Sequence, residues 1–186
     1  MLIVSHHVLD TTPLKLPKGA VLRINVAWVK DLVSLTGLLK RIKHDVYLDY
    51  PQGRSKPPRP SITLKETLSL VKKFPNIKYF AVSNVEDPLK IYEIRKQLPA
   101  SIGLVPKIET KNGVNNLEAI IKKINAKHIM LDKEDLYTDL KMDHNLFLEY
   151  IDKARHKAKT CGTDVLELHG VVFYPYRDFS GESKLV

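Results

Sequence analysis

Two segments of the chain place charged side chains directly after short apolar runs. The first, GLVPKIET, contains Lys107 and Glu109, and the second, IMLDKEDL, contains Asp135. Residues two apart leave the same face of a strand, so Lys107 and Glu109 are expected side by side. Carboxylates at neighbouring strand ends can converge on one hard cation such as Mg²⁺, with substrate and water supplying the other oxygens. The two segments therefore predict a divalent-cation site with a lysine beside it.

Polar residues also end other apolar runs of the chain. In parallel α/β folds the reactive side chains gather at the carboxyl ends of the strands. By this rule the further candidates are Arg23, Asn25, Asp49, Ser83 and His169. An arginine in such a place could hold a substrate carboxylate through two parallel hydrogen bonds. His169 has no evident partner in the sequence, so a structural role is the favoured interpretation for it.

Seven short apolar runs, rich in branched residues, predict the strands that carry these candidates. They span Leu2–Ser5, Val21–Val26, Val46–Tyr50, Tyr79–Ser83, Gly103–Ile108, His128–Leu131 and Val165–Phe173. Helical patterns lie between most of them. This alternation predicts a parallel sheet with helical crossovers.

Several of the predicted helices have clear start and stop signals. Thr63-Leu-Lys-Glu66 is a capping box, and Asp87-Pro88 combines an N-cap with proline at the first helical position. Asn112-Gly113 opens a third apolar stripe. A longer helix is expected from Asp143, with Gly162 as its C-terminal cap.

These elements predict a single α/β domain over residues 1–186. A (β/α)₈ barrel typically needs about 250 residues, and about 200 at the lower limit. The expected fold is therefore a shortened or incomplete TIM-type barrel with about seven strands, and an open doubly wound sheet is the alternative. A missing eighth strand would leave sheet edges open, so we expect a homo-oligomer, most simply a homodimer, with the N-terminal strand or the tail 174–186 at its interface.

The composition is that of an ordinary globular protein. With 44% hydrophobic and 27% charged residues, collagen-like and wholly disordered classes are excluded. A single cysteine allows no intrachain disulfide, which suits a reducing compartment. We expect neither a secretory leader nor a membrane span, because the sequence offers no fitting apolar run. The expected location is the cytoplasm.

The chain is basic, with 30 Lys and Arg against 21 Asp and Glu and a formal net charge of +9. Most of these cations are spread over polar helix faces, which is typical of a solvated surface. The compact exception is the Pro-rich loop 53–60, GRSKPPRP, which is expected to be exposed with Arg54, Lys56 and Arg59. Zinc-ligand spacing and RNA-binding motifs are absent from the sequence, so nucleic acid is the least favoured partner and a small anion the most favoured.

Longer stretches of the sequence resemble the phosphoenolpyruvate/pyruvate barrel superfamily. That superfamily includes pyruvate kinases, citrate lyase beta-subunit-like enzymes and class II 2-oxo-acid aldolases. IGLVPKIETKNGVNNLEAI followed by IMLDKEDLYTDL is similar to its metal-binding core. LRIN followed by VYLDYPQGR is similar to the pyruvate kinase order, whereas FLEYIDKARHKAKTCGTDVLELHG looks more like the citrate-lyase branch. The resemblance covers most of residues 20–170.

The resemblance implies roles for a few positions. Glu109 and Asp135 match the two carboxylates that hold Mg²⁺ or Mn²⁺. Arg23 matches the arginine that pairs with the substrate carboxylate or phosphate, and Lys107 matches the lysine that pyruvate kinases keep beside the transferred phosphoryl group. In such a site the metal charge stabilises the enolate of a 2-oxo acid, and a lysine adds a point charge as negative charge develops.

Weaker matches complete the expected substrate-binding set. Asn25 and Asp49 match monovalent-cation or supporting positions, and Ser83 and Arg54 join them. The loop before the metal aspartate is normally small or rich in glycine, but here it begins with Asp132. That residue adds a carboxylate next to a site for an anion.

Two functions follow as hypotheses. The first is a metal-dependent lyase or aldolase acting on a pyruvate-like 2-oxo acid or an acyl-CoA-type substrate through a metal-stabilised enolate. The alternative is a catalytically reduced, pyruvate kinase-like protein that binds an anionic ligand or a protein partner. The nucleotide-closing domain of pyruvate kinases has only the loop 53–60 in its place, so phosphoryl transfer to ADP is not expected.

Overall fold

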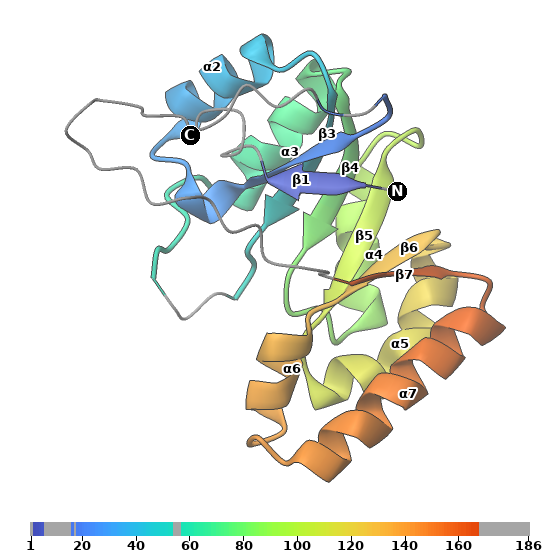
Figure 1. Cartoon of the computed structure of the whole chain (residues 1–186). Coiled ribbons are helices and arrows are strands. Elements are labelled where there is room, and N and C mark those ends of the chain that lie inside the picture. Colours follow the sequence, from blue (N-terminus) through green and yellow to red (C-terminus); the bar gives the residue numbers. More distant parts are fainter. Residues whose placement is uncertain (1, 6–15, 17, 54–56, 168–186) are drawn as a thin grey trace, which may run out of the picture.

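The computed structural model of the chain describes residues 2–5, 16, 18–53 and 57–167. Within these residues, seven parallel strands follow one another across a single sheet in sequence order and curl into a half-barrel (Figure 1). The strands are β1 (Ile3–Ser5), β2 (Val21–Asn25), β3 (Asp45–Tyr50), β4 (Ile77–Val82), β5 (Gly103–Ile108), β6 (His128–Leu131) and β7 (Asp164–Glu167). The strand order never reverses, as it would in a doubly wound sheet. The shortened TIM-type barrel is therefore confirmed, and the open doubly wound alternative is wrong.

Six α-helices lie along the described part of the chain. They are α2 (Leu32–Arg41), α3 (Leu64–Lys73), α4 (Pro88–Gln97), α5 (Lys111–Ile124), α6 (Lys133–Asp139) and α7 (His144–Thr160), and a short 3-10 helix, η1 (Val26–Trp28), follows β2. Every one of these helices is too short or too polar to cross a bilayer. In Figure 1, α5, α6 and α7 gather at the β5–β7 end of the sheet, and α2 and α3 at the other end.

The capping signals of the sequence form as expected. The Thr63 hydroxyl accepts the Glu66 amide, and the Glu66 carboxylate accepts the Thr63 amide at 2.8 Å, which closes the capping box of α3. Asp87 caps α4, with Pro88 at the first helical position. Gly162 follows Cys161, the C-cap residue of α7, and has a φ of +65°, in the left-handed conformation that favours glycine.

The start of α5 and the existence of α6 differ from the expectation. Thr110, rather than Asn112-Gly113, caps α5, because its hydroxyl accepts the Gly113 amide at 3.1 Å. The segment after β6, expected to be a loop, forms α6 because the Asp132 carboxylate caps its first turn. The final strand was predicted to run to Phe173; it is described to Glu167, and the rest lies outside the described residues.

The two faces of the sheet bury different residues. The outward side chains of the strands join those of the helices in the large core, for example Leu22, Leu48, Phe80 and Ile108. The concave face holds a smaller cluster of Val21, Tyr47, Ala81 and Val105. Side chains alternate along a strand, so the residues two positions further on face the same concavity. Those residues are Arg23, Asp49, Ser83 and Lys107. The fold therefore brings the polar candidates together above an apolar floor.

Candidate active site

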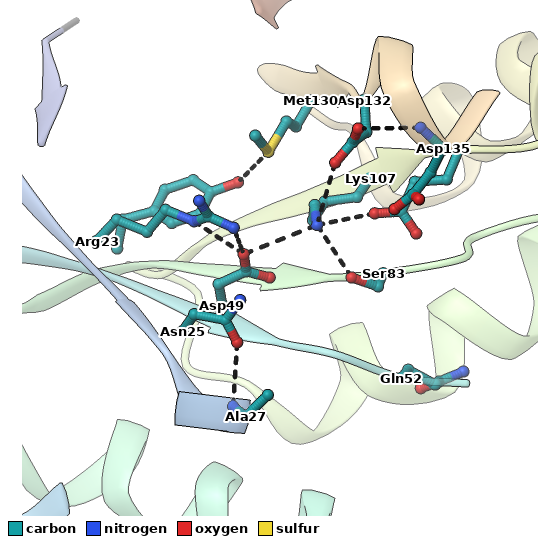
Figure 2. A network of polar contacts seen from close by, with 12 residues as sticks. Arg23, Asn25, Ala27, Asp49, Gln52, Ser83, Lys107, Met130, Asp132 and Asp135 are labelled. Carbon is teal, nitrogen blue, oxygen red and sulfur yellow. Dashed lines mark hydrogen bonds and ion pairs between the residues drawn. The ribbon is translucent and has the colours of Figure 1, made fainter. Parts of the chain in front are cut away.

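A cavity of about 280 Å³ opens at the carboxyl ends of the strands. Its described lining consists of Arg23, Asn25, Pro51, Gly53, Ser83, Asn84, Lys107, Glu109, Thr110, Asp132, Asp135, Thr138 and Asp139. The residues come from the ends of β2 to β6 and from α6, which agrees with the rule that reactive groups gather at this edge. Figure 2 shows the polar contacts that join many of them.

Three carboxylates meet on one side of this cavity. Glu109 follows β5, Asp132 follows β6, and Asp135 lies in the first turn of α6; one oxygen of each lies within 4.8 Å of the others. Glu109 is buried, and the two aspartates are half-buried. Such a set of oxygen ligands could hold a hard divalent cation, which would draw them closer together.

Lys107 occupies the centre of the polar cluster. Its buried ammonium group lies 2.8 Å from Glu109 Oε1 and donates to Ser83 Oγ at 3.1 Å. Asp49 and Asp132 each place a carboxylate oxygen 3.8 Å from the same nitrogen. Figure 2 shows these contacts converging on the one nitrogen.

Asp49 lies behind the cavity wall rather than in its lining. Its fully buried Oδ2 accepts hydrogen bonds from Arg23 Nε at 2.9 Å and Arg23 Nη2 at 2.5 Å. Asp49 Oδ1 is buried without a hydrogen-bond partner among the described residues. Asp49 therefore anchors the guanidinium group of Arg23 at the cavity and leaves one lone oxygen in the interior.

The other predicted substrate-binding residues differ in their placement. Ser83 contacts Lys107, whereas the Asn25 side chain accepts the Ala27 amide at 3.0 Å and caps η1, although it also lines the cavity. Arg54 lies outside the described residues, but its neighbour Gly53 lines the cavity. His169 lies outside the described residues as well.

Two residues of the site were missed or misjudged from the sequence. Asn84 donates its backbone N–H to Glu109 Oε2 at 2.8 Å. A backbone donor cannot be predicted from the pattern of side chains in the sequence. Asp132 was expected to add a carboxylate next to an anion site, without a role as a metal ligand. Its carboxylate caps α6 and lies close to those of Glu109 and Asp135. The spacing Asp132-x-x-Asp135, typical of a helix N-terminus, was the sequence signal for the cap.

Burial and charge act in opposite directions on the two central groups. Burial raises the pKa of the Glu109 carboxyl, and the nearby Lys107 ammonium only partly offsets this. Burial alone would lower the pKa of Lys107, but Asp49 and Glu109 raise it above its ordinary value. Lys107 therefore stays cationic, while the ionised form of Glu109 is less favoured than in a free glutamate, and a further positive charge nearby would lower the pKa of Glu109 again.

Comparison with known proteins adds a fold relationship. No protein-family model and no curated protein sequence matches the chain. Among solved structures, an HpcH/HpaI aldolase/citrate lyase family protein from Burkholderia cenocepacia J2315 superposes with a TM-score of 0.60 at 12% identity, over 79% of this chain and 70% of that one. Citrate synthase SbnG gives 0.61 at 12% identity, over 80% and 67%. Macrophomate synthase gives 0.57 at 14% identity, over 80% and 62%.

At such identities the likeness concerns the fold alone. All three structures are barrels of the phosphoenolpyruvate/pyruvate type, so the fold expected from the sequence resemblance is confirmed. The chain spans roughly two thirds of the length of these structures. What it binds and what reaction it performs therefore depend on the residues of its own cavity.

Proposed function

We propose that this chain is a divalent-metal-dependent lyase or aldolase acting on a pyruvate-like 2-oxo acid or an acyl-CoA-type substrate. The observation that carries the proposal is the meeting of Glu109, Asp132 and Asp135 beside Lys107 and Arg23 in one cavity. The cavity lies where barrels of this kind place their reactive groups. The fold shared with an aldolase/citrate lyase family protein supports the same class of reaction.

The residues present fit a cation such as Mg²⁺ or Mn²⁺. All three candidate ligands are carboxylates, the ligand type that these hard cations prefer. Among the described residues that line the cavity, carboxylates outnumber cationic groups, so a bound cation would improve the charge balance of this lining. Burial is the main cause of the raised pKa of Glu109, Lys107 and the Asn84 amide oppose it, and the nearby Asp132 carboxylate adds to it.

The side chains of the site suit an anion that carries a carboxylate. A bound divalent cation would stabilise the negative charge of an enolate formed from a 2-oxo acid. Arg23, held from behind by Asp49, presents a fixed guanidinium group to a substrate carboxylate. Lys107, fixed by Glu109 and Ser83, supplies a point charge where negative charge develops.

The basic loop suits a phosphate-bearing substrate. Gly53 lines the cavity and Arg59 is exposed, so the loop 53–60 leaves from the rim of the site. Arg54 and Lys56 belong to the same loop in the sequence and lie outside the described residues. Replacement of all three cations by alanine is expected to weaken binding of a CoA-like or phosphorylated ligand at least tenfold. Pyruvate and oxalate should bind as before; equal losses for both ligand types would contradict this part of the proposal.

Calorimetric titration with Mg²⁺ and Mn²⁺ tests the proposal. We expect Glu109→Gln and Asp135→Asn each to reduce divalent affinity at least a hundredfold, because each removes a charged ligand from a set of three. Glu118→Gln is the matched control, since Glu118 pairs with Lys122 on the exposed surface of α5. Unchanged binding in both site variants would overturn the assignment.

A second candidate function is favoured by one observation. Asp132 brings its carboxylate to 3.8 Å from Lys107, in the part of the cavity where an anionic substrate would lie. A protein that binds an anion together with a cation, without turnover, is consistent with that crowding. Metal-dependent oxalate binding, with no cleavage or decarboxylation of 2-oxo acids by the unmodified protein or by Asp132→Gly, would favour this reading.

A further inference from the structure

The turn that follows β4 has an unusual backbone. Asn84 has a φ of +53°, in the left-handed region that residues other than glycine rarely adopt. Asparagine is among the few residues that tolerate it. Residues held in this conformation cluster at functional sites, where the surrounding structure imposes it.

This backbone conformation directs one hydrogen bond into the cavity. The Asn84 N–H donates to Glu109 Oε2 at 2.8 Å, while Lys107 contacts Oε1 at the same distance. One oxygen of the carboxylate is thus held by the turn after β4 and the other by Lys107 on β5. The plane of Glu109 is fixed before any ligand arrives.

Three contacts hold the turn in place. The Asn84 side chain donates to the Gln52 carbonyl at 2.8 Å. The Val85 N–H donates to the Lys107 carbonyl at 3.2 Å. The Val85 carbonyl packs so closely on Gly113 that a Cβ there would lie 2.8 Å from its oxygen. The left-handed conformation of Asn84 is therefore held by contacts with the loop after β3, with β5 and with the first turn of α5.

We propose that Asn84 is a positioning residue for metal binding. Its left-handed backbone aims the amide at Glu109 and sets the orientation in which that carboxylate meets a divalent cation. The inference rests on the proposed function, because it assumes that Glu109 is a metal ligand. Groups that orient metal ligands typically contribute tenfold to a hundredfold to metal affinity.

The test compares substitutions that differ in backbone freedom. Asn84→Gly keeps the amide and the left-handed conformation, whereas Asn84→Val disfavours that conformation because its side chain is β-branched. We expect Mn²⁺ affinity, measured by calorimetry, to fall at least tenfold in Asn84→Val and less than threefold in Asn84→Gly. Equal losses in the two variants would overturn the proposal, because the side chain and not the backbone would then be responsible.

Asn125 provides a matched control. It also has a left-handed backbone, with a φ of +49°, and is exposed at the far end of α5, about 20 Å from the site by the length of that helix. Asn125→Val is expected to lower the melting temperature about as much as Asn84→Val while leaving Mn²⁺ affinity unchanged. A similar loss of affinity in Asn125→Val would mean that destabilisation alone explains the result, and would overturn the proposal.

A measurement without metal separates this inference from the proposed function. Hydrogen exchange of the Asn84 amide should be slow in the metal-free protein and at least tenfold faster in Glu109→Ala, where its acceptor is gone. If the unmodified protein binds neither cation, the proposed function fails even when this exchange result holds. If cations bind but the Asn84 amide exchanges equally fast in both proteins, the positioning role alone fails.

Discussion

Two ion clusters lie on opposite faces of the same sheet and differ in how their carboxylates are neutralised. On the outer face, Glu167 at the end of β7 accepts Arg155 through both oxygens, at 2.9 and 3.0 Å, and contacts Lys133 at 2.6 Å. These partners lower the pKa of Glu167 to about 2. On the inner face burial raises the pKa of Glu109, and Asp49 Oδ1 has no hydrogen-bond partner within the part of the chain that the structure describes.

The difference lies in how completely each carboxylate is satisfied. On the outer face two cations, Arg155 and Lys133, neutralise the single carboxylate of Glu167. Its ionised form is therefore favoured, and the cluster stabilises the end of the sheet. Inside, the carboxylates of Asp49, Glu109 and Asp132 share Lys107 and Arg23, and Asp135 lies beside two of them, so carboxylates outnumber cations among the described residues of this partly buried place. Such an arrangement costs stability and is expected where a ligand completes the charge balance. The contacts of the outer cluster fit a structural role, and the charge balance of the inner one supports the binding role proposed for it.

The largest expected effect tests the anchor of the inner cluster. Asp49→Ala should lower the free energy of unfolding by about 3 kcal/mol, because it leaves the half-buried Arg23 without its carboxylate. Urea denaturation measures this loss. In the double variant Asp49→Ala/Arg23→Met we expect part of the stability to return, since the cation that Asp49 held is removed as well. Strictly additive losses would show that Asp49 stabilises the fold by some means other than this pair.

Next in size is the removal of the outer carboxylate. Glu167→Gln should cost about 1.5 kcal/mol at pH 7, less than the full pKa shift would give, because Arg155 and Lys133 are partly exposed to water. The folded pKa lies below the unfolded one, so this contribution is complete above about pH 4.5 and is lost as the pH falls toward 2. The stability difference between variant and parent, measured by denaturation at pH 7 and pH 3, should therefore shrink at the lower pH. A difference independent of pH would contradict the charge argument.

A pair of glycines tests how rigid the inner turn is. Gly113→Ala should lower stability by about 1 kcal/mol, because its Cβ would press on the Val85 carbonyl, and backbone cannot give way cheaply. Gly37→Ala, in α2 with nothing within 4 Å, should raise stability by about 0.5–1 kcal/mol through helix propensity. Thermal unfolding of both variants checks the signs. Equal stabilisation by both would mean that the turn around Asn84 is free to move.

The fold was predictable to a large extent, since strand periodicity and caps are local signals. The ranges Gly103–Ile108 and His128–Leu131 agree with the structure, as does the capping box of α3. The candidate carboxylates Glu109 and Asp135 followed from position at strand ends. The hydrogen bond from Asn84 to Glu109 could not be predicted from the sequence. It depends on a backbone angle and on contacts with the loop after β3, with β5 and with α5, which lie far apart in sequence. The pairing of Arg23 with Asp49 depends in the same way on the register between β2 and β3.

The smallest expected effect is the change in stability when the charge of Glu109 is removed. It should have the opposite sign to the change in Glu167→Gln, or be close to zero. A carboxyl whose folded pKa is raised takes up its proton more readily in the folded state, so its contribution to stability falls as the pH rises from the unfolded pKa through the folded one. Glu109→Gln should therefore leave the metal-free protein as stable as the parent at pH 7, or more stable by up to about 1 kcal/mol, because Lys107 retains Asp49 and Asp132 as counter-ions. Added Mg²⁺ should reverse the order, since only the parent gains stability by binding. Thermal unfolding of both proteins with and without Mg²⁺ measures this. A loss in Glu109→Gln comparable to that in Glu167→Gln, and unaffected by Mg²⁺, would show that the inner cluster is structural like the outer one.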